Sequence, residues 1–132
     1  MTTVMLDTNV VSQLVKRNEI VRKHMRAAQL SACISVVTEG ELLYGLAKHP
    51  DAKQLNTLVS QMLQRLDVLP WTRETARRYG TLRAELERKG KTLAPLDLMI
   101  AAHALESDAI LATRDRAFAS VPGLKVVDWS AP

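Results

Sequence analysis

Short apolar runs alternate along the chain with longer segments whose apolar residues recur every three or four positions. The short runs are β-branched or apolar and stop at polar or turn residues, which predicts strands, whereas the longer spacing is typical of amphipathic helices. The predicted strands are 3–6, 32–35, 67–69, 109–113 and 124–127. The predicted helices are one directly after Asp7, then 18–28, 36–47, 51–66, 72–89 and 95–107, with a helical turn at 115–120.

This alternation of strands and helices predicts the fold class. Consecutive parallel strands need crossover connections, so the pattern favours a mainly parallel sheet with helices on both faces, an α/β/α sandwich of three layers. The 132 residues form one domain, 1–132, because no repeat or linker divides them. In sheets of this kind functional residues gather at the carboxyl ends of the strands.

Composition narrows the functional classes. Hydrophobic residues make up 47% and charged residues 24%, which is ordinary for a globular protein and argues against disorder or a fibrous repeat. The net charge of +4 is compatible with a polyanionic partner. No apolar stretch has the length of a membrane span or the pattern of a secretory leader, so we expect a cytoplasmic protein with no membrane association.

Several familiar kinds of site are unsupported by the sequence. The single cysteine, Cys33, excludes an internal disulfide, and its place in an apolar run predicts a buried thiol rather than a nucleophile. No glycine-rich phosphate loop follows the first strand. His103 stands in an apolar helix, where a core histidine is the first expectation.

Four acidic residues stand at positions of interest. Asp7 and Asp115 follow predicted strands, Asp97 comes near the start of the 95–107 helix, and Glu41 lies within the 36–47 helix. Structural roles are open for each: an aspartate at a strand end commonly caps the next helix, an acid in a first turn complements the helix dipole, and a helical glutamate can simply face solvent.

The surroundings of these acids favour a shared site. Asp97 precedes an apolar run through 98–105, so its helix should be buried and its carboxylate should face protein. Parallel topology brings the ends of the strands before Asp7 and Asp115 to one edge of the sheet. Clustered carboxylates repel unless a cation neutralises them, and oxygen ligands select Mg²⁺ or Mn²⁺. The cluster therefore predicts metal-assisted phosphoryl transfer or hydrolysis.

The sequence then resembles the PIN-domain ribonucleases, and within them the VapC-type toxins of bacterial toxin–antitoxin pairs. Met5-Leu6-Asp7-Thr8-Asn9 is similar to the opening motif of that family. The segments 34–45, 95–101 and 113–118 resemble its later motifs, in order and at suitable spacing, so the resemblance covers essentially the whole chain.

This resemblance implies a set of site residues. Asp7, Glu41, Asp97 and Asp115 would be catalytic, with Mg²⁺, for which Mn²⁺ would substitute, held by the three aspartates. Thr8, Asn9 and Thr113 would support them through hydrogen bonds. Some relatives carry a further acid after the fourth motif, whereas Ala117 and Phe118 follow here, which leaves both one and two metal ions open.

The resemblance also implies an activity and partners. The activity would be endonucleolytic hydrolysis of RNA, with tRNA as an expected substrate, leaving 5′-phosphate and 3′-hydroxyl ends. A VapB-type antitoxin and a second copy of the chain are the expected protein partners. Two alternatives remain: a PIN-domain nuclease of housekeeping RNA processing, and a non-enzymatic receiver-like signalling domain. A receiver would place adjacent acids after its first strand, but here Thr8 and Asn9 follow Asp7.

Basic residues supply candidates for RNA contact. Arg114 and Arg116 flank Asp115, so they should reach the rim of any pocket that Asp115 enters, and RNA binding needs such phosphate contacts. Elsewhere, an acid precedes a base by four residues on several helices and predicts surface ion pairs. These pairs are Glu19 with Lys23, Glu74 with Arg78, and Glu85 with Lys89.

Overall fold

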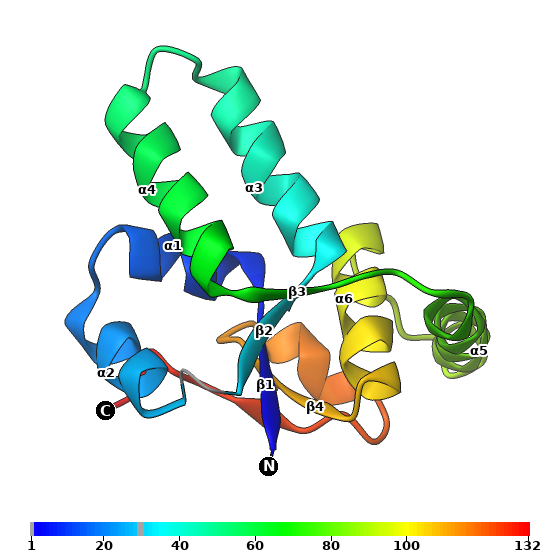
Figure 1. Ribbon diagram of the computed structural model, residues 1–132. Helices are drawn as coiled ribbons and strands as arrows, with labels where there is room; N and C mark the ends of the chain where they lie inside the picture. Colours follow the sequence, from blue (N-terminus) through cyan, green and yellow to red (C-terminus); the bar gives the residue numbers. More distant parts are fainter. Residues whose placement is uncertain (1, 29–30) are drawn as a thin grey trace.

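A five-stranded sheet forms the centre of the computed structural model, which describes residues 2–28 and 31–132 (Figure 1). The strand order is β3-β2-β1-β4-β5, and all neighbouring pairs are parallel. The parallel sheet predicted from the sequence is confirmed. The strands are β1 (Thr3–Leu6), β2 (Ala32–Ser35), β3 (Asp67–Leu69), β4 (Ala109–Ala112) and β5 (Val126–Val127).

The helices follow the predicted pattern with small shifts at their ends. They are α1 (Thr8–Val15), α2 (Glu19–Ala28), α3 (Val36–Lys48), α4 (Lys53–Arg65), α5 (Arg73–Arg88), α6 (Pro95–Glu106) and the 3₁₀ helix η1 (Arg116–Ser120). The strand predicted at 124–127 forms only at its last two residues. No helix in the part of the chain that the structure describes is long and apolar enough to cross a membrane.

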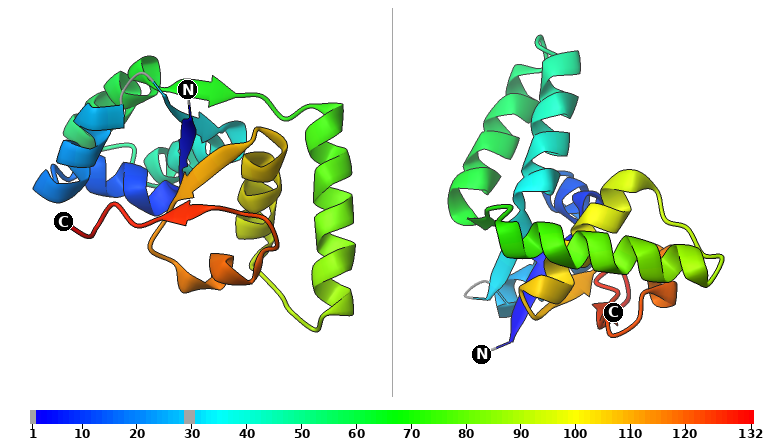
Figure 2. Two further views of the ribbon diagram at one scale, coloured as in Figure 1. Left: turned by 90° about the horizontal axis from the view of Figure 1, so that it is seen from below. Right: turned by 90° about the vertical axis from the view of Figure 1, so that its right-hand side faces the viewer.

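Side chains of the sheet alternate between two cores. Met5, Cys33 and Leu111 pack with α5, α6 and η1, whereas their strand neighbours Leu6, Ile34 and Ala112 pack with α1, α2, α3 and α4. Figure 2 shows α5 and α6 on the side of the sheet opposite α1 and α2. This alternation, which follows from the two-residue period of a strand, produces the predicted three layers.

The α3–α4 hairpin extends beyond the sheet (Figure 1). The two helices lie side by side, and α4 contacts α1, α3 and β3. Val59 of α4 is buried, but Leu55 is 37% exposed near the tip. The apolar stripe of α4 therefore packs largely on helices and leaves part of its surface open.

The strand register determines where the chain leaves the sheet. Leu6 is aligned with Ala112, so Asp7 and Thr113 follow directly at neighbouring carboxyl ends. The backbone N–H of Asp7 donates to the carbonyl of Ala112 at 3.1 Å. Ser35 ends β2 on the other side of β1, and α3 begins at once after it. These strand ends and the helices that follow them surround one edge of the sheet.

Candidate active site

Asp7 is buried at the junction between β1 and α1, with only 7% of its surface exposed. Its Oδ1 accepts a 2.8 Å hydrogen bond from the N–H of Val10, so the carboxylate caps α1. Burial raises the pKa of Asp7, and the negative charge of Asp115 adds to this. A hydrogen bond from Thr113 and the positive charge of Arg114 lower the pKa in part. On balance the pKa of Asp7 lies above its ordinary value, so ionising this carboxyl costs more than ionising a free aspartate.

Thr113 connects Asp7 to Asp115. Its hydroxyl is buried, contacts the Asp7 carboxylate, and accepts a 3.1 Å hydrogen bond from the N–H of Asp115. Asp115 itself is exposed, and its Oδ1 accepts from the N–H of Ala117 at 2.9 Å, which caps η1. Asp7 and Asp115 therefore have the capping roles that the sequence allowed and also lie close enough to repel each other.

Glu41 reaches the same region from α3. It is half-buried, and its Oε1 accepts a 2.8 Å hydrogen bond from the hydroxyl of Thr8, the first residue of α1. Glu41 is therefore not a freely solvated helix glutamate. Asn9, the next residue of α1, is exposed.

Asp97 lies at the centre of the acidic group. It stands in the first turn of α6, directly after Pro95 and Leu96, on a helix whose later residues are mostly buried. Its own side chain is half-buried. Burial raises the pKa of Asp97 first, and the negative charges of Asp115, Glu41 and Asp7 raise it further. Asp97 is thus electrostatically coupled to acids from three other elements.

The donor chemistry of this acidic cluster, which consists of Asp7, Glu41, Asp97 and Asp115, fits a hard divalent cation. All its ligand atoms are carboxylate oxygens, and a cation would relieve the repulsion that raises the pKa of Asp97. Within residues 2–28 and 31–132, no three His, Cys, Asp or Glu side chains form a ready-made metal cage. An ion such as Mg²⁺ keeps several waters in its coordination shell, so binding it does not require a complete cage of protein ligands.

The two arginines proposed for RNA contact are both exposed beside this cluster. Arg114 lies near enough to Asp7 to lower its pKa, and to Asp128 to act on that residue in the same direction. Arg116 begins η1, directly after Asp115. Both positions are compatible with phosphate contacts at the rim of the cluster.

His103 lies in the core and contacts Ser35, the residue that precedes α3. This contact was not predicted from the sequence. The ring is 1% exposed, packs edge-on to Trp71 with centroids 5.6 Å apart, and places Nδ1 2.7 Å from the hydroxyl of Ser35. The backbone carbonyl of Pro70 raises the pKa of the ring in part, but burial, which lowers it, is the larger influence. Nδ1 and the Ser35 hydroxyl share one hydrogen bond, in which either group can donate.

This histidine joins two helices of the site. Burial lowers its pKa, which favours the neutral ring. The hydroxyl of Ser35 also accepts a 3.0 Å hydrogen bond from the N–H of Val37 and so caps α3. His103 thereby links α6, which carries Asp97, to the first turn of α3, which carries Glu41. The prediction of a core histidine is confirmed.

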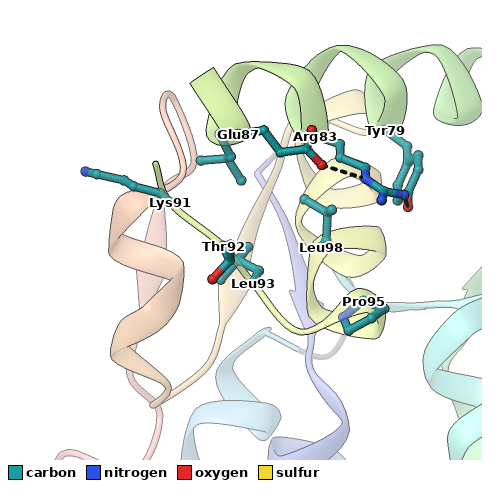
Figure 3. Close-up of a pocket in the computed structure, with 9 residues that line it drawn as sticks. Tyr79, Arg83, Glu87, Lys91, Thr92, Leu93, Pro95 and Leu98 are labelled. Atoms are coloured by element: carbon teal, nitrogen blue, oxygen red, sulfur yellow. Dashed lines mark hydrogen bonds and ion pairs between the residues drawn. The ribbon is translucent and has the colours of Figure 1, made fainter. Parts of the chain in front are cut away.

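Two hollows open between the helices, and only the second is lined by a residue of the acidic cluster. The first, of about 210 Å³, opens between α5 and the start of α6 (Figure 3). There the Arg83 side chain donates to Glu87 and Tyr79, so this guanidinium is already engaged. The second is a groove of about 290 Å³ between α1, α3 and α4, and both Thr8 and Glu41 line it. This groove therefore begins at the acidic cluster.

Cys33 lies apart from this chemistry. It is buried in β2, and burial together with the charge of Asp67 raises the pKa of its thiol to about 12. The thiol is protonated at neutral pH and unsuited to nucleophilic attack. This agrees with the buried thiol predicted from the sequence.

Comparisons with known proteins agree with this geometry. Residues 4–124 match the PIN domain family. The chain is 38% identical over 128 residues to a tRNA(fMet)-specific endonuclease VapC of Shigella flexneri, covering 96% of this chain and 97% of that relative. It is 34% identical over 128 residues to a ribonuclease VapC2 of Haemophilus influenzae, covering 95% and 96%.

Solved structures of related proteins have the same fold. The fold superimposes on a chain of the DNA-bound VapBC crystal structure from Salmonella typhimurium with a TM-score of 0.92 and 35% identity, covering 98% of this chain and 99% of that one. A chain of the FitAcB structure from Neisseria gonorrhoeae superimposes with a TM-score of 0.86 and 27% identity, covering 98% and 100%. The similarity extends through all the elements that carry the acidic cluster.

Proposed function

Because this chain belongs to the PIN-domain family and, within it, to the VapC ribonucleases, we propose that the acidic cluster is the catalytic centre of a Mg²⁺-dependent toxin that cleaves structured RNA. The activity is that of an endoribonuclease in a metal-dependent family. The observation that carries the assignment to this site is the position of the acids: Asp7 follows a strand end aligned with the one before Thr113, Thr113 accepts from the N–H of Asp115, and Thr8 beside Asp7 donates to Glu41. The charges of these three acids also raise the pKa of Asp97.

Each acid has a role that its surroundings support. Asp7, Asp97 and Asp115 would hold the metal ion, since two of them have a raised pKa that a cation would lower. Glu41, oriented by Thr8, would accept a hydrogen bond from the attacking water and align it with the phosphorus. Thr113 hydrogen-bonds both the Asp7 carboxylate and the backbone N–H of Asp115, and so fixes the position of one aspartate relative to the other.

The cofactor supplies one part of the chemistry. When bound, Mg²⁺ stabilises the negative charge that develops on the phosphate oxygens during hydrolysis. The side chains of the protein position the substrate and the water, and Arg114 and Arg116 would contact neighbouring phosphates at the rim.

The substrate and partners follow from the relatives. The Shigella relative is named for cleavage of tRNA(fMet), and we propose tRNA as the substrate class here. The Salmonella and Rickettsia felis relatives were solved as VapBC complexes on DNA, which supports a VapB-type antitoxin as partner. A homodimer and a cytoplasmic location complete the proposal.

Cleavage of purified bacterial RNA tests this function. Antitoxin-free protein is incubated with total RNA in Mg²⁺ or in EDTA, and the new ends are mapped by sequencing. Discrete Mg²⁺-dependent cuts in tRNA support the proposal, whereas intact RNA in both conditions contradicts it. A small antitoxin gene directly beside this gene would distinguish the toxin from the housekeeping nuclease.

A further inference from the structure

The net positive charge of the chain is concentrated on α5 and the short segment that follows it. Residues 73–91 contain seven Lys and Arg residues and three Asp and Glu residues, whereas the whole chain contains 18 and 14. This segment therefore accounts for the entire net charge of +4. The helix packs on α6, and Figure 2 shows it along one side of the molecule. Its outer side presents this charge to solvent.

One side of α5 is buried, and the opposite side is exposed and cationic. Leu82 and Leu86 pack with residues of α6 in the core. At 3.6 residues per turn, the residues opposite these leucines fall within about 80° of one another around the helix axis. All of them are exposed, and none is acidic. We call them the arginine face of α5: Arg73, Arg77, Gly80, Ala84 and Arg88.

The arginines at the two ends of this face are available to bind a ligand. Neither Arg73 nor Arg88 forms an ion pair with an acidic side chain that the structure describes. They are the first and last residues of the 16-residue helix, which puts them about 22 Å apart along its axis. Arg77 pairs with Glu74, but both side chains are largely exposed, and such a surface pair is readily exchanged for another anion. Widely separated cationic groups suit an extended polyanion better than a single small anion.

We propose that the arginine face of α5 binds the double-helical stem of the RNA substrate through its backbone phosphates. The inference rests on the proposed function and adds to it the part of the RNA that this helix contacts. Because α5 packs on α6, whose first turn carries Asp97, a stem held by α5 lies one helix away from the acidic cluster. Phosphate contacts fix the position of a nucleic acid without reading its sequence, and A-form RNA is recognised mainly by its shape and backbone.

The composition of the face favours a duplex over other partners. A protein interface is usually anchored by large aromatic or apolar side chains, and a membrane-surface helix turns its apolar side outward, whereas the leucines of α5 face the core. Single strands are bound by stacking their bases on exposed aromatic rings. The ring of Tyr79 on α5 is half-buried, and its hydroxyl accepts a hydrogen bond from Arg83 (Figure 3). The face therefore has charge but no stacking surface, which matches a double helix bound through its backbone.

Two sets of variants separate this face from the overall charge. Arg73→Gln/Arg88→Gln removes the arginines at the two ends of α5. The matched control, Lys53→Gln/Arg65→Gln, removes two exposed basic residues from the first and last positions of α4, with the same change in net charge. The second set, Gly80→Glu and Gly80→Gln, differs only in charge at the centre of the face, where an added Cβ meets nothing within 4 Å.

Binding is measured in EDTA by fluorescence anisotropy, with a labelled RNA duplex and with single-stranded oligouridylate of the same length. The α5 double variant should bind the duplex at least about 10-fold more weakly than the wild type, whereas the α4 double variant should bind it equally well. Its slope of log Kd against log salt should fall by roughly 1.8, the value for two phosphates of a double helix. Gly80→Glu should bind the duplex at least about 10-fold more weakly than Gly80→Gln.

Cleavage of tRNA in Mg²⁺ is the second readout. The α5 double variant should raise KM for tRNA with little change in kcat, because the stem contacts are the same in the ground state and the transition state. Sedimentation of each variant reports its oligomeric state. A change in the oligomeric state of the α5 double variant, with duplex binding retained, would assign the face to a contact between two copies of the chain and overturn the inference.

The remaining outcomes separate this inference from the proposed function. If the wild type cleaves RNA and the α5 double variant binds the duplex as tightly as the wild type, the stem-binding face is overturned and the nuclease stands. Equal weakening by the α4 and α5 double variants also overturns it, as does a loss of single-strand binding as large as the loss of duplex binding. Failure of the wild type to bind the duplex overturns it as well. If the α5 double variant alone loses duplex binding but the wild type cleaves nothing in Mg²⁺, the face is supported and the nuclease is contradicted.

Discussion

The hydroxyl of Thr8 donates a 2.8 Å hydrogen bond to Oε1 of Glu41, two residues 33 positions apart in the sequence. The bond joins the first turn of α1 to the middle of α3, and it restricts a glutamate that would otherwise sample several rotamers. Glu41 is thereby held beside Asp97, whose pKa responds to its charge. The threonine acts on the candidate site by orienting one of its acids.

Removing this hydroxyl should lower the catalytic rate. Thr8→Val keeps the shape of the side chain but leaves Glu41 without its donor, and hydrogen bonds to charged groups contribute about 1.5 to 3 kcal/mol. We expect kcat for RNA cleavage to fall about 10-fold, the factor that corresponds to the lower end of that range, with little change in KM. Thr57→Val on α4, which removes only an exposed bond to the Lys53 carbonyl, is the control. An unchanged kcat in Thr8→Val would show that the bond is dispensable.

The acidic cluster should make stability depend on pH in opposite directions with and without metal. Folding raises the pKa of Asp7 and Asp97 above the ordinary 3.8, so the native state takes up protons more readily than the unfolded chain. In EDTA their contribution to stability is therefore lost as pH rises through the raised values and is fully present below pH 3.8. With Mg²⁺ the ionised carboxylates bind the ion, so the Mg²⁺-induced increase in Tm grows with pH.

Thermal unfolding with Mg²⁺ or EDTA, in steps from pH 4 to pH 8, measures this difference. Because other groups titrate in the same interval, the wild type is compared with Asp7→Asn/Asp97→Asn, in which the amide oxygen of the new side chain at position 7 can still cap α1. This variant should have a higher Tm than the wild type in EDTA at pH 7 and no Mg²⁺-induced increase. An equal Mg²⁺ response in both proteins would place the metal elsewhere.

His103 should stabilise the fold through its bond to Ser35. His103→Leu leaves the Ser35 hydroxyl without this partner in the core, which should cost about 1 to 3 kcal/mol in urea unfolding. His103→Gln, which has both an acceptor and a donor, should recover part of the loss. Since burial lowers the native pKa of His103, its contribution is full above pH 6.5 and is lost as pH falls below that value. Equal stability of the Leu variant and the wild type would refute this assignment.

Cys33 should be chemically silent in the native protein. A thiol with a pKa of about 12 inside β2 is almost fully protonated at pH 8, so iodoacetamide should label it only after denaturation. Cys33→Ala should retain wild-type RNA cleavage. Rapid labelling of the folded protein, seen by intact mass, would contradict the burial of this residue.

The parts of the fold and site that depend on strand order could be predicted from the sequence. Asp7 and Asp115 follow strands, and parallel topology alone brings such positions to one edge. The burial of α6 follows from its apolar run, so the environment of Asp97 was also predictable.

Contacts that depend on helix rotation or on long-range packing could not be predicted. The Thr8–Glu41 bond requires the relative placement of α1 and α3, and the contact between Ser35 and His103 joins residues 68 positions apart. The partners in surface ion pairs could also be predicted only in part. Glu85 pairs with Lys89 as predicted, but Glu19 pairs with Arg22 and Glu74 with Arg77, because partners three and four positions away share one helix face.

The most direct test of the catalytic assignment is RNA cleavage by Asp97→Asn compared with Asp108→Asn. Asp97 is the acid coupled to the other three, whereas Asp108 is exposed at the opposite end of the sheet, in a left-handed conformation (φ 54°) that asparagine also adopts readily. We expect the rate of Mg²⁺-dependent cleavage by Asp97→Asn to be at least 100-fold below that of the wild type, because removing one major source of transition-state stabilisation has an effect of about this size. Asp108→Asn should cleave at the wild-type rate. Wild-type cleavage by folded Asp97→Asn would contradict the assignment of this cluster as the catalytic centre.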